Sequence, residues 1–248
     1  MIRQRLIRAE LRKLVTTTMP LVFLVVLVVI SSITGAAVIF GTDADGSKGF
    51  IATAADQQSL MAFAGNAFII AGLFGAIAVA REYGHGTVIP TFLAWPRRHE
   101  AVLAQFFAMF LAGGVLGFVG AALTIVAVAV SLPTTDHGFL VAAADVTRVL
   151  AASTFAGAAG AVLGGGIGAL LRNTGGAVAA AALILLVVPP VVAQLVTDSA
   201  SWIPSTLGNV LSGSADDVSA LAALAAIFAW AAIPAIVGLV SVQRRDVV

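Results

Sequence analysis

The chain has 248 residues, of which 60% are hydrophobic and only 10% are charged, and it contains no cysteine. Soluble domains carry roughly 45–50% apolar and about 25% charged residues, so the composition excludes a water-soluble globule, and it equally excludes a disordered chain. The lack of cysteine excludes disulfide scaffolds and thiolate metal sites. The net charge of +1 says little until the charges are placed. An all-α, polytopic membrane protein is the class that fits.

Six stretches are long and apolar enough to cross a membrane as helices, since about 20 such residues span the hydrocarbon core. They are residues 20–40, 60–80, 101–132, 149–171, 175–196 and 218–242. We expect residues 20–242 to form one six-span bundle, and the whole chain, 1–248, to be a single transmembrane domain.

The basic residues predict the orientation of these spans. Every Lys and Arg except Lys48 and Arg148 lies before the first span, after the second or fourth, or after the sixth. With six spans, these segments share one side of the membrane, and the excess of basic residues makes that side cytoplasmic. Both termini are therefore predicted to be cytoplasmic.

The segment before the first span predicts an amphipathic helix. Its apolar residues follow helical spacing along one face: Ile7, Leu11, Leu14 and Val15. A neighbouring arc is basic: Arg5, Arg8 and Arg12. Such a helix lies in the plane of the lipid headgroups, so we expect residues 1–18 to form an interfacial elbow helix.

Ionisable residues lie at the edges of the predicted spans and not within them. A proton- or sodium-coupled carrier normally needs an intramembrane charge or a broken helix, so this pattern favours either a transporter powered from elsewhere or a scaffold without cargo. The three histidines, His85, His99 and His137, lie in loops. They offer no base for hydrolysis within the membrane and no clustered ligands for a metal ion.

Small residues recur in the fourth span at Gly157, Gly160, Gly164 and Gly168. Such spacing lets helix backbones approach closely, which indicates either tight packing within the bundle or a seam between two copies.

Two other spans contain polar or helix-breaking residues. One narrow arc of the second span carries an amide among apolar side chains: Phe63, Asn66, Ile70 and Phe74. Asn66 indicates either a hydrogen bond between helices or a surface that faces substrate. Pro189 and Pro190 remove two backbone donors from the fifth span and predict a kink, and a kinked helix can line a cavity.

The largest loop on the predicted cytoplasmic side, residues 81–99, mixes aromatic, apolar and charged side chains. Pro90 and Pro96 limit any helix in it to short pieces. Phe92, Leu93 and Trp95, if exposed, would seek either the membrane interface or a partner protein.

The loop contains Glu82-Tyr83-Gly84-His85-Gly86-Thr87, followed by Pro90-Thr91-Phe92-Leu93-Ala94 and Pro96-Arg97-Arg98. With this loop, the chain resembles the ABC type-2 permeases, the membrane subunits of ATP-binding cassette exporters. Residues 9–14 look like the elbow helix of that family, and Trp202-Ile203-Pro204-Ser205 looks like its short re-entrant segment. The likeness covers the whole six-span layout, and the loop after the second span is its most specific motif.

The resemblance implies a half-transporter in a bacterial plasma membrane. Two permease subunits, identical or different, would each sit on a separate ATPase subunit, which binds ATP and magnesium, with a short coupling helix in the loop after span 2. The implied coupling residues are Glu82, Tyr83, His85, Gly86, Thr87, Thr91, Arg97 and Arg98. The implied path for a hydrophobic or amphipathic drug, lipid or peptide lies near spans 2 and 5, at Phe63, Asn66, Ile70, Phe74, Pro189 and Pro190.

We expect no catalysis, cofactor or nucleic-acid partner for this chain. The nearest approach to a phosphate-binding loop, at residues 41–49, has its lysine one place late and lies on the predicted outer side. Two other functions remain open: a membrane scaffold or anchor subunit without cargo, and an ion-driven secondary carrier.

Overall fold

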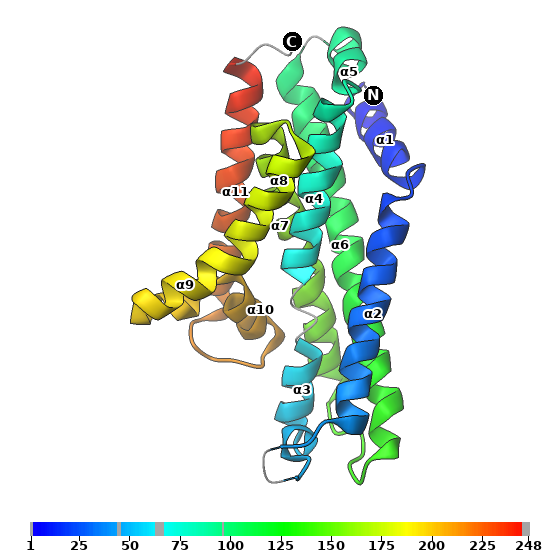
Figure 1. Cartoon of the computed structure of the whole chain (residues 1–248), viewed down its shortest axis with the longest axis vertical. Helices are drawn as coiled ribbons and strands as arrows, with labels where there is room; N and C mark the ends of the chain where they lie inside the picture. The colour runs from blue at the N-terminus through cyan, green and yellow to red at the C-terminus, as the bar shows by residue number, and fades with distance from the viewer. Residues whose placement is uncertain (1, 44–45, 63–66, 96, 245–248) are drawn as a thin grey trace.

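The computed structural model describes residues 2–43, 46–62, 67–95 and 97–244, and these form helices joined by turns, with no β-strand among them. Figure 1 shows an elongated bundle whose long helices run roughly along one axis. Within this described part, six helical segments are long and apolar enough to span a membrane. The prediction of an all-α fold with six helical segments able to span a membrane is confirmed.

Each predicted span corresponds to one helical segment. The spans are α2 (Met19–Phe40), α3 with α4 (Ala54–Ala62 and Ala67–Gly84), α6 (Arg98–Ser131), α7 (Ala143–Leu171), α8 with α9 (Thr174–Ala182 and Val188–Leu195) and α11 (Ala220–Arg244). Helices α6 and α7 begin before the apolar stretches predicted for them, because polar residues extend a helix beyond its hydrophobic part without breaking it.

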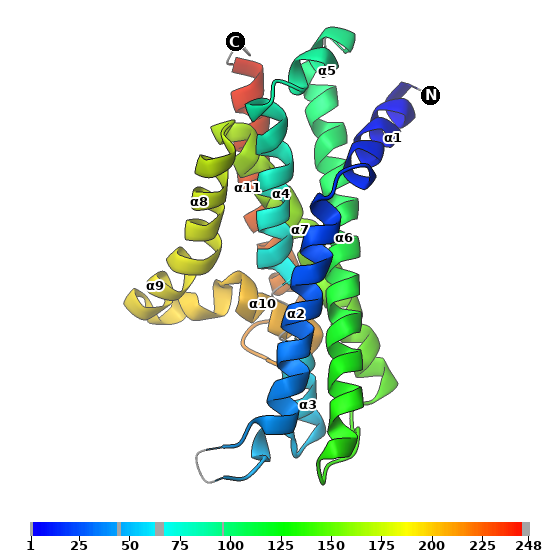
Figure 2. The same cartoon turned by 45° about the vertical axis from the view of Figure 1, so that its right-hand side comes forward.

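Three short helices flank the spans: α1 (Ile2–Val15), α5 (Val88–Ala94) and α10 (Pro204–Ser212). Helices α1 and α5 and the last turn of α11 lie at one end of the bundle, which we call the α5 end (Figure 1). Figure 2 shows α1 inclined to α2 at this end. The α3 helix lies near the opposite end.

Helix α7 is central, because it packs against α4, α6 and α11. Its glycines allow this packing: a Cβ atom on Gly164 would overlap the carbonyl of Gly72 in α4, and one on Gly157 would overlap the carbonyl of Gly113 in α6. Close approach of backbones is what small residues permit in membrane helices. Of the two interpretations of the glycine stripe, packing within the bundle is the one that the structure shows.

The fifth span is bent. A π-helical turn, η4 (Leu183–Val187), follows α8, and α9 then begins with Pro189 and Pro190 in its first turn. Figures 1 and 2 both show α9 turning away from the bundle. Proline lacks an N–H group and clashes with the preceding turn, and a π turn is a common site of such bends. The predicted kink is confirmed.

Polar side chains hold the end of α10 against two other helices. The Gln58 side-chain amide in α3 donates to the carbonyl of Ser212 (2.8 Å), and Arg148 Nε in α7 donates to the carbonyl of Leu211 (3.0 Å). Both donors satisfy carbonyls that the end of a helix leaves without partners. Arg148 therefore has a structural role at the end of α10.

Candidate functional site

The turn from α4 into α5 exposes apolar side chains at the end of the bundle. Gly86 has a φ of +67°, which glycine adopts at little cost, and it separates α4 from α5. Val88 is buried and Thr91 half-buried, whereas Ile89 is 44% and Leu93 78% exposed. Because Ile89 and Leu93 are four residues apart, they share one face of α5. We call this pair the α5 surface.

The segment after α5 is fixed to the start of α6. The indole Nε1 of Trp95 donates to Glu100 Oε2 (2.9 Å), and a guanidinium nitrogen of Arg97 lies 3.3 Å from Glu100 Oε1. The guanidinium of Arg98 lies over the ring of Phe92, 5.8 Å from its centroid. These contacts tie the C-terminal end of α5 to α6, and the turn at Gly86 joins its other end to α4.

His85 and Thr87 are exposed in the turn before α5. The Thr87 hydroxyl donates to the carbonyl of Glu82 (3.2 Å). His85 Nδ1 lies 2.9 Å from the carbonyl of Arg81, and since a carbonyl only accepts, Nδ1 carries the hydrogen in this contact. Both predicted coupling residues therefore cap the end of α4 while their other atoms face outward.

Glu82 connects α4 to α1 through a charged network. Lys13 Nζ lies 2.7 Å from Glu10 Oε1 and 3.3 Å from Glu82 Oε2. Burial raises the pKa of Glu10, the charge of Glu82 adds to this effect, and Lys13 opposes it. Burial alone would lower the pKa of Lys13, but the two carboxylates outweigh it and raise that pKa. The sequence motif indicated Glu82 as a coupling residue but did not predict that Glu10 and Lys13 belong to the same charged network.

Tyr83 points into the bundle and not toward the α5 surface. The guanidinium of Arg172 lies over its ring, 5.6 Å from the centroid. Arg172 ends α7 in the left-handed conformation (φ 55°) and donates to the carbonyl of Ser241 in α11 (3.1 Å). Tyr83 and Arg172 therefore link the end of α4 to the ends of α7 and α11. From the sequence, Arg172 was only one of the basic residues that predict the orientation of the spans in the membrane.

The two predicted substrate-path residues of α4 that the structure describes, Ile70 and Phe74, pack in one apolar cluster. Phe63 and Asn66 lie outside the described residues. Phe74 is buried in the apolar cluster that joins α4 to α2 and α6, edge-to-face with Phe23 at 5.3 Å between ring centroids, and Ile70 packs against the same cluster. The turn before the prolines packs elsewhere: Leu185 belongs to a cluster with residues of α7 and α11. Pro189 is buried and Pro190 exposed.

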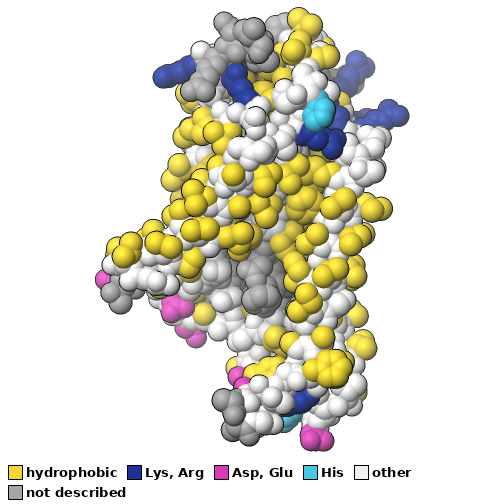
Figure 3. All heavy atoms as spheres, in the orientation of Figure 1, with side chains coloured by type: hydrophobic (Ala, Val, Ile, Leu, Met, Phe, Trp, Pro, Cys, Tyr) yellow, Lys and Arg dark blue, Asp and Glu magenta, His cyan; other side chains and the backbone are white. Residues whose placement is uncertain are grey.

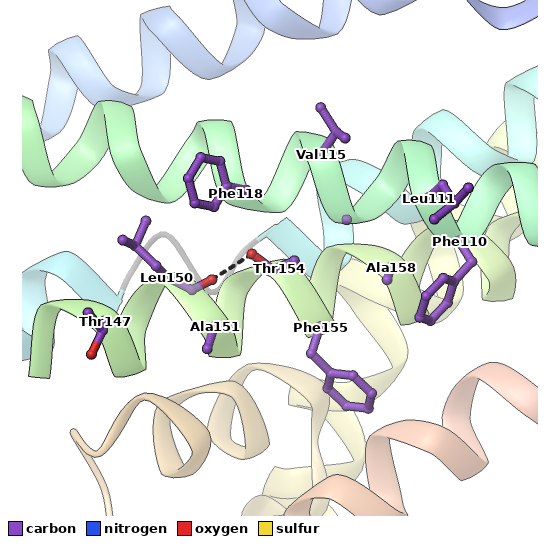
Figure 4. A pocket seen from close by; sticks show the side chains of 11 residues that line it. Phe110, Leu111, Val115, Phe118, Thr147, Leu150, Ala151, Thr154, Phe155 and Ala158 are labelled. Atoms are coloured by element: carbon purple, nitrogen blue, oxygen red, sulfur yellow. Dashed lines mark hydrogen bonds between the residues drawn. The ribbon is translucent and has the colours of Figure 1, made fainter. Parts of the chain in front are cut away.

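An apolar groove of about 820 Å³ lies between α6 and α7 (Figure 4). Phe110, Val115 and Phe118 line it from α6, and Leu150 and Thr154 from α7. The hydroxyl of Thr154 donates to the carbonyl of Leu150 (2.7 Å), within its own helix. Among the residues that the structure describes, the groove is therefore lined without any charged group, and Ile70, Phe74, Pro189 and Pro190 are not among its lining residues.

No protein-family model matches the chain, and no curated protein matches its sequence. Among the residues that the structure describes, there is also no group of three or more His, Asp or Glu side chains that would hold a metal ion. The functional assignment therefore depends on the geometry of the α5 end and on the residue pattern of the loop that contains it.

Proposed function

We propose that this chain is the permease subunit of an ATP-driven exporter, resembling the ABC type-2 permeases, with ATP hydrolysis in a separate subunit. The observation that supports this most directly is α5: a short helix between the second and third spans that exposes Ile89 and Leu93 and is fixed at both ends to long helices. Apolar side chains exposed beyond the spans are covered either by the membrane interface or by a partner protein, and we assign Ile89 and Leu93 to the partner.

In this proposal the α5 surface docks onto the ATPase, and three connections carry its movement into the spans. The turn at Gly86 leads to α4, the contact of Lys13 with Glu82 leads to α1, and the stacking of Tyr83 with Arg172 leads to α7 and α11. Nucleotide would shift the permease between inward- and outward-facing states only if the affinity of the ATPase for nucleotide differs between the two states of the complex.

The proposed orientation places the α5 end and both termini in the cytoplasm of a bacterial cell, with α1 as an interfacial elbow. Figure 3 shows most of the visible Lys and Arg side chains near the α5 end, and the visible Asp and Glu side chains in the half of the molecule away from it. A second permease subunit would complete the transport path. The cargo is hydrophobic or amphipathic, because the spans offer essentially no charged groups to a polar ion.

Purification of the tagged full chain from its host membrane in mild detergent tests this proposal. We expect an ATPase subunit to co-purify, and Leu93→Asp to lower the co-purifying ATP hydrolysis about tenfold or more, because one buried apolar anchor can dominate an interface. Leu140→Asp is the matched control, since Leu140 is an exposed leucine (51%) in the loop between α6 and α7, away from α5.

Three results would contradict the proposal. The first is a stable complex that contains no nucleotide-binding protein, which would identify a scaffold subunit. The second is a reconstituted transporter in which Glu82→Ala, His85→Ala and Arg97→Ala all leave ATPase stimulation and transport unchanged. Transport that follows the membrane potential without ATP would instead identify an ion-driven carrier.

A further inference from the structure

A pocket of about 460 Å³ lies at the α5 end, between the α1–α2 turn and the last turns of α4. Most of the residues that line it are polar or charged, namely Lys13, Thr16, Thr17, Arg81, Glu82, His85 and Thr87, and the others are Leu14, Met19 and Ala78. Helix α2 begins and α4 ends at this level, so in a bilayer the pocket lies where hydrocarbon gives way to headgroups.

The threonine hydroxyl groups of this pocket already donate hydrogen bonds to backbone carbonyls. Thr16 donates to the carbonyl of Arg12 (2.9 Å), Thr17 to that of Leu14 (3.0 Å), and Thr87 to the Glu82 carbonyl. A hydroxyl oxygen that donates keeps lone pairs for accepting. The threonines therefore present acceptors to a ligand and not donors.

The guanidinium of Arg81 is the group in this pocket whose N–H donors can bind a ligand. This guanidinium makes no hydrogen bond or ion pair with any residue in the described ranges, whereas Lys13 is held by Glu10 and Glu82. A guanidinium matches the oxygens of a phosphate, because it offers paired N–H donors and a positive charge.

The pocket is lined by two basic side chains, Arg81 and Lys13, and by the Glu82 carboxylate, and Lys13 also pairs with Glu10 beside it. A ligand that carried only negative charge would be attracted to Arg81 but repelled by the Glu82 carboxylate, whose cationic partner Lys13 is shared with Glu10. A zwitterion places its phosphate on Arg81 and its ammonium among the carboxylate and the threonine oxygens. The polar pocket therefore favours a headgroup with one charge of each sign and with N–H donors.

An apolar groove of about 730 Å³ adjoins the polar pocket and shares Leu14, Thr16 and Thr17 with it. Its other walls come from α1, α2, α4 and α6, at Leu11, Val15, Leu21, Leu24, Phe74, Leu111, Val115 and neighbouring residues. A charged pocket beside an elongated apolar groove fits a molecule with a polar head and a hydrocarbon tail.

We infer that the α1–α2 turn holds a phospholipid with a phosphoethanolamine headgroup, its phosphate on Arg81, its ammonium near Glu82 and one acyl chain in the groove lined by Leu24. The site lies beside the Lys13–Glu82 contact, so the bound lipid fixes α1 against α4. It does not depend on an ATPase partner, and its test is separate from that of the proposed function.

The test measures which lipids the purified full chain retains. The protein is equilibrated in nanodiscs that contain equal parts of phosphatidylethanolamine, phosphatidylglycerol and phosphatidylcholine, extracted into detergent, washed, and examined by native mass spectrometry. We expect phosphatidylethanolamine to be retained preferentially, and Arg81→Gln to lower its retention about tenfold, the usual effect of losing a charge-assisted hydrogen bond. Arg8→Gln, which removes an exposed charge from α1, leaves retention unchanged.

A second pair of variants tests the acyl-chain groove without altering charge. Leu24→Trp fills the groove and is expected to lower retention, whereas Val25→Trp adds the same bulk at an exposed neighbour that does not line it. Equal retention of all three lipids, preference for phosphatidylglycerol, or equal retention by wild type and Arg81→Gln would each overturn the inference. So would a Leu24→Trp variant that retains as much lipid as Val25→Trp.

Discussion

Two adjacent glycines in α6, Gly113 and Gly114, differ in how closely α7 approaches them. A Cβ on Gly113 would overlap the carbonyl of Gly157 and approach the side chain of Ala161 in α7. A Cβ on Gly114 would meet its nearest atoms, in Ala158 and Thr154, at 3.7 Å, an ordinary contact. The two positions differ in the direction in which they face and not in residue type.

We therefore expect Gly113→Ala to lower the free energy of unfolding by about 1–3 kcal/mol, because an added methyl group in a closely packed contact forces the backbones apart. Gly114→Ala is the matched control and should change it by no more than about 1 kcal/mol, since alanine favours helix over glycine. Thermal unfolding of both variants in one detergent measures the difference. Equal melting temperatures would show that α6 and α7 do not pack as described.

Sequence spacing predicted that the glycines of α7 allow close packing, but not which helix each one meets. Gly157 meets α6, whereas Gly164, about two turns further along nearly the same side of α7, meets α4. The partners Gly72 and Gly113 lie in other spans, and local periodicity contains no information on such long-range pairs.

At the scale of elements, α1 is held by a network whose strength changes with pH. Burial raises the pKa of Glu10 above its ordinary 4.5, so the docked helix binds this proton more tightly than a released helix does. Docking is then most favourable below about pH 4.5 and weakens as the pH rises through the raised pKa. Lys13, whose pKa is raised above 10.5, weakens docking further only above that value.

Spin labels at Ala9→Cys and Ala94→Cys, two exposed positions on α1 and α5, measure this docking. The labelling needs no background substitutions, because the chain has no cysteine. We expect the docked fraction in the distance distribution to fall as the pH rises above 4.5, and the added change Glu10→Gln to remove that dependence. A docked fraction that rises with pH would contradict the network.

Elements whose cause is local could be predicted from the sequence, and contacts between distant segments could not. The bend of span 5 follows from Pro189 and Pro190, which act within their own helix. The turn into α5 depends on Gly86, another local effect. By contrast, the contact of Lys13 with Glu82 joins residues 69 positions apart, and the stacking of Tyr83 with Arg172 joins two spans.

At the scale of the whole molecule, two of the three short helices and the last turn of α11 lie at the same end of the bundle. These two short helices are α1 and α5 (Figure 1). The sequence predicted this grouping because an even number of spans returns the chain to the side from which it started. Whether the α5 surface meets an ATPase depends on that end facing the cytoplasm.

Single cysteines at two exposed positions test the orientation: His99→Cys at the start of α6 and Asp136→Cys in the loop after it. A membrane-impermeant maleimide is expected to label Asp136→Cys on intact cells, and to label His99→Cys only after the membrane is made permeable. The residues lie at the two ends of one long helix, so a membrane-spanning α6 cannot expose both to the same side. Labelling of His99→Cys on intact cells would place the α5 surface outside the cell, where no ATP-hydrolysing subunit could dock onto it.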